Sequence, residues 1–149
     1  MMIRYMKKED KEHIIALVNK FYKTDAACHD VDIKIKERCF DEAIDGVDTF
    51  EGLVIEENDV IVGYAYVSKY YTTEIGGFTQ MIEQLYVDDC TRGKGYGTKL
   101  LQWLEENNND VKRMRLEVNN DNIHAIRLYQ RLGYEFIDYG QMVKEKNSK

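Results

Sequence analysis

Apolar residues recur along this chain with the spacings expected for alternating helices and strands. Short runs rich in Val, Ile, Leu and Tyr, some of them alternating with polar residues, predict six strands. The predicted strands cover residues 2–6, 50–55, 60–71, 78–88, 112–118 and 134–143. Apolar residues three or four positions apart predict four helices between them. These helices end near Lys23, Gly46, Asn107 and Gly133, and Asp10 is expected to cap the first one.

The element order is β-α-α-β-β-β-α-β-α-β, with hairpins in the first half and strand–helix units in the second. This order predicts an α/β (α+β) fold, in which one mixed central sheet is flanked by helices on both faces. A length of 149 residues fits one domain, and no linker, repeat or low-complexity segment divides residues 1–149. Residues 144–149 are expected to form a frayed tail.

The composition is that of a soluble globular protein, with 44% hydrophobic and 32% charged residues. The net charge of −6 argues against a nucleic-acid partner and favours a cationic small molecule. No window has the length and apolarity of a membrane span and no signal peptide is evident, so we expect a cytoplasmic protein with no membrane partner. The three cysteines and three histidines lack metal-ligand spacing. We therefore expect reduced thiols and no metal.

A glycine-rich stretch follows the fourth predicted strand. Gly93, Gly95 and Gly97 stand at alternate positions, with Arg92 and Lys94 beside them. Glycines allow tight bends and leave successive backbone N–H groups uncovered, and a helix that starts there adds the positive end of its dipole. The stretch therefore predicts a binding site for an anion, most simply a phosphate group.

Two common phosphate-binding loops do not fit this stretch. The dinucleotide fingerprint G-x-G-x-x-G requires a glycine where Thr98 stands, which disfavours a dinucleotide-dependent oxidoreductase. No reading through the glycines gives the Walker pattern G-x-x-x-x-G-K-[ST]. The pattern that remains is Arg-x-x-Gly-x-Gly at residues 92–97, between a strand and a helix.

This pattern resembles the pyrophosphate loop of the GCN5-related N-acetyltransferases, the GNAT superfamily. A second signature of that family, N-x-x-A-[IV]-x-L-Y-x-x-x-G-[FY], resembles residues 122–134. Its matching residues are Asn122, Ala125, Ile126, Leu128, Tyr129, Gly133 and Tyr134. The two ordered signatures and the element order extend the resemblance over nearly the whole chain. One departure is Asp89, where the family often has proline, and this difference changes loop stiffness more than chemistry.

The resemblance implies an enzyme with acetyl-CoA as co-substrate. It assigns the pyrophosphate to backbone N–H groups of the glycine loop and the following helix, and the pantetheine arm to the preceding strand. In the family this strand usually bulges and splays away from the strand after it, so the N–H of Leu85 would polarise the thioester carbonyl. Asn122 would cap a helix and bind the CoA arm, whereas Arg92 and Lys94 are either phosphate ligands or solvated surface residues. The implied CoA-binding residues are Leu85, Tyr86, Val87, Arg92, Gly93, Lys94, Gly95, Tyr96, Gly97, Thr98, Asn122 and Tyr129.

Acetyl transfer to an amine requires a neutral nucleophile, whereas a free alkylamine is almost wholly protonated at neutral pH. Glu83 is the carboxylate in the strand that leads to the glycine loop, so it is the candidate base, directly or through water. Without a bulge, strand alternation would place it with Met81, Leu85 and Val87, in a semi-apolar setting that raises its pKa. The alternative is a solvated or ion-paired glutamate. The resemblance makes Tyr129 the acid that protonates the departing CoA thiolate, although its apolar neighbours also suit a core tyrosine.

The acceptor is expected to be a small molecule with a primary amine. Candidates for the acceptor site are Asp25, Asp30, Tyr70 and Glu74. The three carboxylates, together with Asp32, would hold a second cationic group of this molecule, and Tyr70 would line the pocket. Each is also typical of an ordinary solvated loop. Cys90 adjoins the glycine loop, but a covalent relay through it would need a partner base that the sequence does not offer. Sheet edges left open would allow a homodimer.

Three functions are compatible with these features. The first is direct transfer of acetyl from acetyl-CoA to a primary amine of a small cationic molecule. The second is acetylation of a protein N-terminus or lysine side chain, which a shallow open groove over the central strands would favour. The third is a non-catalytic regulatory domain that binds acyl-CoA without turnover.

Overall fold

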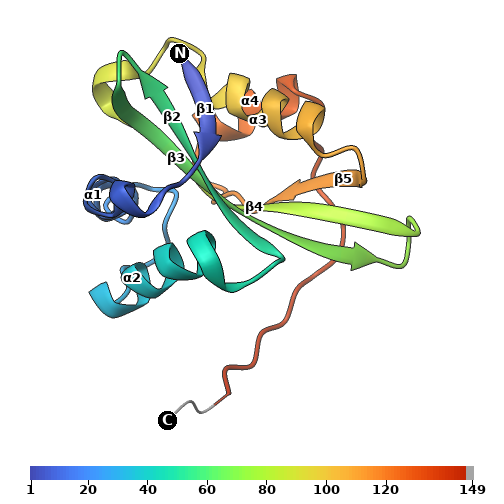
Figure 1. The fold of residues 1–149 in the computed structure, drawn as a ribbon. Coiled ribbons are helices and arrows are strands. Elements are labelled where there is room, and N and C mark those ends of the chain that lie inside the picture. The colour runs from blue at the N-terminus through green and yellow to red at the C-terminus, as the bar shows by residue number, and fades with distance from the viewer. Residues whose placement is uncertain (147–149) are drawn as a thin grey trace.

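A twisted sheet of five strands separates two layers of helices in the computed structural model, which describes residues 1–146 (Figure 1). The strands are β1 (Met2–Tyr5), β2 (Phe50–Glu57), β3 (Val60–Thr72), β4 (Gly77–Val87) and β5 (Val111–Leu116). They lie side by side in sequence order; the first four are antiparallel, and β5 runs parallel to β4. This mixed sheet confirms the predicted α/β (α+β) fold class, with five strands instead of six.

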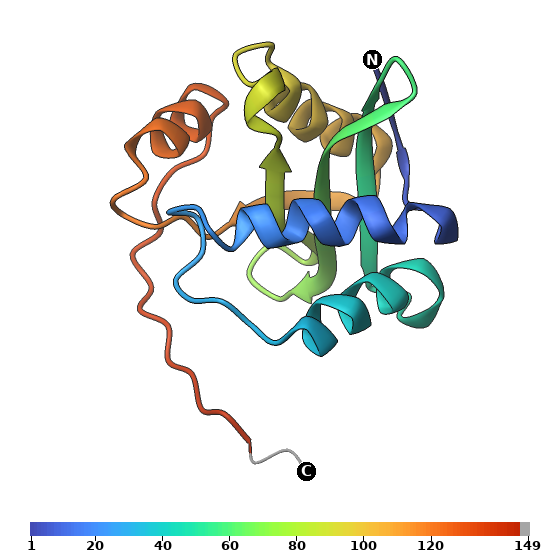
Figure 2. The same ribbon diagram turned by 90° about the vertical axis from the view of Figure 1, so that its left-hand side faces the viewer.

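Two helices lie on each side of the sheet. The helices are α1 (Lys11–Phe21), α2 (Ile33–Asp41), α3 (Tyr96–Asn107) and α4 (Ile123–Arg131). Three short turns accompany them: η1 (Lys8–Asp10), η2 (Glu42–Gly46) and η3 (Asp89–Thr91). Figures 1 and 2 show α1 and α2 on one face, with α3 and α4 on the other. Within the described part of the chain, no helix has the length and apolar character needed to cross a membrane.

The alternation of side chains along the strands divides the core between the two faces. On one face, Val54 and Tyr64 pack under α1 and α2. On the other face, Leu53 belongs to a cluster that packs against α3. The apolar side of α2 is narrower than predicted, because Ile33 and Ile35 are exposed. The two cores hold β4 in the centre of the molecule, with helices on both sides of it.

Asp10 has a different role from the one predicted. Its side chain does not cap α1 but accepts a hydrogen bond of 2.7 Å from the N–H of Lys7. Arg4 of β1 donates to both carboxylate oxygens of Asp10, at 2.8 and 3.1 Å, and to Glu56 of β2 at 2.8 Å. Burial alone would raise the pKa of Asp10, but the hydrogen bonds from Arg4 and Lys7 outweigh it and lower that pKa.

Replacing Arg4 by methionine is expected to lower the free energy of unfolding by about 3 kcal/mol, because Asp10 would remain as a buried charge without its partner. Asp10 is only 5% exposed. Since the fold lowers the pKa of Asp10, its contribution to stability is complete above its unfolded pKa of about 4 and is lost as the pH falls through the lower folded value.

Urea unfolding at neutral pH, and again below about pH 3, tests this prediction. The difference in stability between wild type and Arg4→Met should narrow at the lower pH. Lys8→Met, at an exposed position of the same segment, is the control. If both variants are equally stable at neutral pH, the contacts of Arg4 with Asp10 and Glu56 contribute no more to the free energy of unfolding than an exposed side chain does.

The prediction of a strand over residues 134–143 is wrong, because residues 134–146 form neither helix nor strand. The segment has the apolar pattern of a strand, but a strand requires a neighbour for its backbone groups. This segment instead leaves the end of α4 and runs away from the sheet (Figures 1 and 2). Phe136 and Tyr139 are consequently 61% and 72% exposed. Residues 147–149 of the expected tail lie outside the described part of the chain.

Candidate functional site

One edge of β4 is open along its second half. β5 pairs with β4 only from Phe78 to Ile82, and the partner of Ile82 is Leu116, the last residue of β5. β4 continues to Val87 with β3 on its other side. Along residues 83–87, no strand within residues 1–146 pairs with the edge that faces away from β3, so backbone groups there have no strand partner, and the Val87 carbonyl accepts a hydrogen bond of 3.2 Å from Arg92 Nε. Figure 2 shows α4 standing apart from this end of β4.

Glu83 lies at a β-bulge, at the point where β4 parts from β5. The pairing register with β3 skips Glu83, because the residues on either side of it pair with consecutive residues of β3. Its Oε1 accepts a hydrogen bond of 2.6 Å from the Oγ of Ser68 on β3. The side chain is exposed. The bulge therefore presents a carboxylate at the start of the open edge.

The bulge corrects the expected direction of the Glu83 side chain. An extra residue shifts the alternation of a strand by one position. Ile82 and Leu85 therefore share the face of α3, although three positions separate them. Glu83 and Gln84 turn to the face of α1 and α2, so Glu83 lies on the opposite side from Leu85 and Val87. Its setting is exposed and not semi-apolar.

Gln84 is a residue of this region to which no sequence motif pointed. The hydroxyl of Tyr64 donates to Gln84 Oε1, and Gln84 Nε2 donates to the hydroxyl of Tyr22 on α1, both at 2.9 Å. Burial raises the pKa of both tyrosines, which therefore stay protonated at neutral pH. Burial likewise raises the pKa of Cys39 on the same face, so its thiol stays protonated too. This network fixes the bulge relative to α1.

The glycine loop joins the end of β4 to α3. Gly93 and Gly95 have φ values of +84° and +74°, in the left-handed region that favours glycine. The first backbone hydrogen bond of α3 runs from the N–H of Lys99 to the Gly95 carbonyl at 3.0 Å, so the three preceding N–H groups have no acceptor within the helix. A Cβ at Gly97 would lie 3.9 Å from Leu85 Cδ2, which places the helix start beside the open edge. Uncovered N–H groups and a helix dipole together make an anion site.

Three basic side chains surround this loop, and each forms an ion pair. The pairs are Lys20 with Asp88 at 3.1 Å, Arg92 with Asp89 at 3.0 Å, and Lys94 with Glu57 at 3.4 Å. Arg92 also lies 5.6 Å from the ring centre of Tyr86, within the range of a cation–π contact. Exposed pairs of this kind contribute little stability. The cations can therefore exchange their carboxylates for a bound polyanion at small cost.

The second signature lies on α4, across from the end of β4. Asn122 caps this helix, as predicted, because its Oδ1 accepts a hydrogen bond of 3.3 Å from the N–H of Ala125. Tyr129 packs against the α3 side of the core, with its ring centre 5.9 Å from that of Tyr134. Burial raises the pKa of Tyr129, and it raises the pKa of Tyr134 to about 12. Both hydroxyls therefore keep their protons at neutral pH.

The four candidate acceptor residues form two separate groups. Asp25 and Asp30 lie between α1 and α2, and Asp30 pairs with Lys36 at 2.8 Å. Tyr70 and Glu74 lie at the β3–β4 hairpin, where they contact two arginine side chains of β5 at 3.3 and 3.4 Å. The first group therefore contacts α2 through Asp30, whereas the second group contacts β5.

One contact links the α1–α2 connection to the chain that leads into α4. Asn119 Nδ2 donates a hydrogen bond of 3.2 Å to the backbone carbonyl of Asp25. Asn119 lies shortly after β5, which ends at Leu116, so this contact lies on the side where β4 and β5 separate. The Asp25 carboxylate is not used in this bond, and the residue is exposed. Of the two acceptor groups, the one with Asp25 thus lies at the end of the sheet where the edge of β4 opens.

Comparison with known proteins gives matches at the level of both sequence and fold. The chain matches the Acetyltransferase (GNAT) family over residues 5–134. It is 40% identical over 58 residues to the spermine/spermidine N(1)-acetyltransferase of Bacillus subtilis (strain 168), and this match covers 37% of the chain and 38% of that protein. It therefore spans well under half the length of that relative.

Two solved structures illustrate the similarity of fold. One is a possible acetyltransferase from Clostridium difficile 630, with a TM-score of 0.84 and 20% identity over 99% of this chain and 98% of that chain. The other is the aminoglycoside N-acetyltransferase AAC(6')-Iy in complex with CoA, with a TM-score of 0.79 and 17% identity over 98% of this chain and 95% of that chain. The family match includes both signatures and most of the chain. The chain belongs to the GNAT acetyltransferase family.

Proposed function

We propose that this protein transfers the acetyl group of acetyl-CoA directly to a primary amine of a small cationic molecule, with a polyamine such as spermidine as the first candidate. The observation that carries the proposal is the open edge of β4 at residues 83–87, which leads into the glycine loop and the N-terminus of α3. Acetyl-CoA has an extended arm that carries amides and ends in a pyrophosphate. The arm matches the open edge of β4, and the pyrophosphate matches the glycine loop and the start of α3.

The residues of the loop and the strand edge fit such a ligand. The uncovered N–H groups at the start of α3 would bind the pyrophosphate, and Arg92 and Lys94 would add charge once they leave their carboxylates. The backbone groups of Leu85 and Val87 on the open edge would pair with the amides of the pantetheine arm, as an added strand does, once Arg92 Nε leaves the Val87 carbonyl. Acetyl-CoA supplies an activated acetyl thioester, and the protein orients it.

The proton transfers are assigned to two side chains. Glu83 would accept the proton of the attacking amine, directly or through water, from its exposed position at the bulge. Tyr129 would donate a proton to the CoA thiolate, since its raised pKa keeps the hydroxyl protonated. Asn122 uses Oδ1 for the helix cap, so its Nδ2 would be the group that contacts the CoA arm.

The charge of the protein and the sequence match favour a cationic acceptor. The net charge is −6, and the matched relative from Bacillus subtilis is named for acetylation of spermine and spermidine. Asp25 and Asp30 in the α1–α2 connection, the candidate group at the end of the sheet where β4 opens, would hold the amino groups that do not react.

The proposal is tested by incubating the protein with acetyl-CoA and spermidine and following acetylated product by mass spectrometry. A thiol reagent is less suitable, because Cys28 and Cys90 are exposed free cysteines. Butylamine and a peptide with an N-terminal alanine are the comparison acceptors. We expect spermidine to react faster than both, because only spermidine has further cationic groups for the acidic residues.

Other results would redirect the proposal in defined ways. If the peptide reacts fastest, the proposed acceptor becomes a protein N-terminus instead of a small molecule. Binding of acetyl-CoA without acetylation of any of the three acceptors would favour a non-catalytic acyl-CoA-binding domain.

Replacing Tyr129 by phenylalanine is expected to lower kcat about 10- to 100-fold and to leave the Kd of acetyl-CoA nearly unchanged, because only the hydroxyl that protonates the thiolate is removed. Steady-state kinetics with spermidine and a binding titration give the two quantities. Tyr5→Phe, at a 50% exposed position on β1, is the control and should keep full activity. An unchanged kcat for Tyr129→Phe would reduce Tyr129 to a packing residue.

A further inference from the structure

The end of β2 lies beside the glycine loop. The turn that joins β2 to β3 has two residues, Asn58 and Asp59, whose φ values are +51° and +63°. A tight hairpin turn requires this left-handed backbone, which Asn and Asp adopt more readily than most other residues. Glu57, the last residue of β2, pairs with Val60 across the turn. The hairpin therefore holds the backbone of Glu57 in one position.

The side chain of Glu57 contacts two residues of the glycine loop. Its Oε1 accepts a hydrogen bond from the hydroxyl of Tyr96, and its Oε2 lies 3.4 Å from the Nζ of Lys94. Tyr96 is the first residue of α3 and is 5% exposed, whereas the Lys94 side chain is half exposed. The hydrogen bond from Tyr96 is the main cause that lowers the pKa of Glu57, so the carboxylate is ionised at neutral pH. One carboxylate of a distant strand thus contacts the residues on both sides of Gly95.

The contact with Tyr96 fixes the start of α3. The ring of Tyr96 packs in the core on the α3 side of the sheet, and the hydrogen bond to Glu57 joins its hydroxyl to β2. Hydrogen bonds to an ionised carboxylate are among the stronger ones in proteins. Because Tyr96 directly follows Gly95, this bond also restricts the glycine loop, whose N–H groups must point together to bind phosphate. The bond therefore favours phosphate binding, since less order has to be gained when the ligand binds.

The contact with Lys94 acts in the opposite direction. The Lys94 ammonium must leave Glu57 before it can pair with a bound phosphate. The Glu57 carboxylate also has the same sign of charge as a phosphate group at the start of α3, and like charges repel each other. Exposed ion pairs are weak, so this effect is smaller than that of the hydrogen bond from Tyr96.

We propose that Glu57 is a positioning residue of the acetyl-CoA site, which orders the glycine loop through Tyr96 and holds Lys94 away from the phosphate groups until acetyl-CoA binds. This inference rests on the proposed function, because it concerns the affinity for acetyl-CoA. The two contacts depend on different properties of the carboxylate. Tyr96 requires an oxygen that accepts a hydrogen bond, which an amide also offers, whereas Lys94 requires the negative charge.

Isothermal titration calorimetry of the full chain with acetyl-CoA at low salt tests the proposal. Glu57→Gln keeps an oxygen acceptor for Tyr96 but loses the charge, so Kd should fall about 3- to 5-fold. This gain should disappear near 1 M NaCl, where the Debye length is only about 3 Å. Tyr96→Phe keeps the ring but loses the hydroxyl, so Kd should rise about 5- to 10-fold. Contacts that only stabilise the fold would change Kd in the same direction in both variants.

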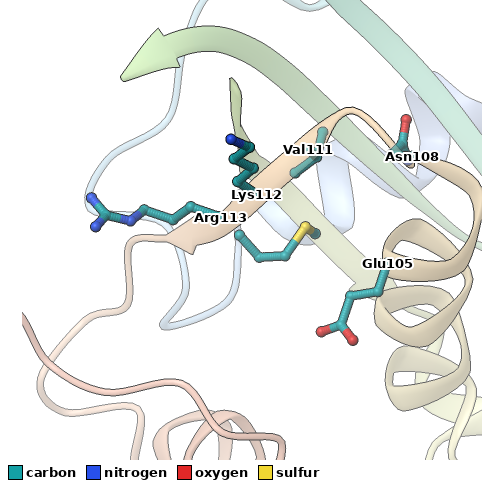
Figure 3. Close-up of a pocket in the computed structure, with 6 residues that line it drawn as sticks. Glu105, Asn108, Val111, Lys112 and Arg113 are labelled. Atoms are coloured by element: carbon teal, nitrogen blue, oxygen red, sulfur yellow. The ribbon is translucent and has the colours of Figure 1, made fainter. Parts of the chain in front are cut away.

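A glutamate at the other end of α3 provides the matched control. Figure 3 shows Glu105 on the last turn of α3, beside a hollow of about 260 Å³ between this helix and β5. It follows Tyr96 by nine residues, roughly 14 Å along the helix axis. Glu105→Gln removes the same charge from the protein and should leave the Kd of acetyl-CoA unchanged.

The results separate this inference from the proposed function. A wild-type chain that does not bind acetyl-CoA overturns both. If the wild type binds, a Kd that does not fall in Glu57→Gln, or does not rise in Tyr96→Phe, overturns the role of Glu57 alone. An equal fall of Kd in Glu105→Gln also overturns it, because net charge would then explain the tighter binding. If Tyr96→Phe fails to fold, Glu57→Leu replaces it, and its Kd should exceed that of Glu57→Gln about 5-fold, because leucine offers Tyr96 no acceptor.

Discussion

Replacing Glu83 by glutamine is expected to lower kcat for spermidine acetylation by about 100- to 10,000-fold, the usual contribution of a positioned general base. Glutamine keeps the shape of the side chain and can still contact the hydroxyl of Ser68, so the bulge is preserved. The amide cannot accept the proton of an ammonium group. The Kd of acetyl-CoA should change little, because Glu83 lies at the far end of the open edge from the glycine loop.

The pH dependence separates loss of a base from structural damage. The contribution of Glu83 to the rate should be largest at neutral pH, because the acceptor amine is protonated there. As the pH rises toward the amine pKa of about 10, the neutral amine becomes abundant and the variant should approach the wild-type rate. Glu106→Gln, an exposed position on α3, is the control for the substitution itself. A wild-type kcat for Glu83→Gln, or a deficit that is equal at all pH values, would contradict the assignment of Glu83 as the base.

Most elements of the fold were predictable because their signals are local. Helix ends follow from capping residues and glycines, as at Asn122 and Gly133, and strands follow from Val- and Ile-rich runs. The strand that was predicted wrongly, at residues 134–143, also has a genuine strand pattern. Whether such a pattern forms a strand depends on a neighbouring edge, which a local pattern cannot specify.

The family resemblance implies a bulge in this strand, but the residue pattern does not locate it at Glu83, because an inserted residue leaves only an indirect trace in a sequence. Strict alternation groups Glu83 with Leu85 and Val87. The trace is the spacing of three between Ile82 and Leu85, which share one face in the structure. The contacts that stabilise the bulge come from Tyr22 and Tyr64, which are distant in the sequence. The glycine loop was easier to predict, since its backbone conformation restricts the residue types directly.

Replacing Gly95 by valine is expected to raise the Kd of acetyl-CoA about 100-fold or more. Gly95 has a φ of +74°, a conformation that a β-branched residue adopts only with strain, and it is the residue from which α3 begins. The loop would have to rearrange and would no longer present the N–H groups at the start of α3 together. Thermal shift measures this directly, because a ligand that binds only the folded protein raises Tm once its concentration exceeds Kd.

A matched glycine separates lost binding from lost stability. Gly76 in the β3–β4 turn has a φ of +59° and lies on a different element from the loop. Gly76→Val should lower the Tm of the free protein by a comparable amount, because both substitutions force valine into the left-handed region. The Tm of Gly76→Val should still rise at the acetyl-CoA concentrations that raise the Tm of the wild type. Gly95→Val should require acetyl-CoA concentrations about 100-fold higher for the same rise. If the Kd rises equally in both variants, general destabilisation explains the loss, and the backbone of the glycine loop is not the phosphate site.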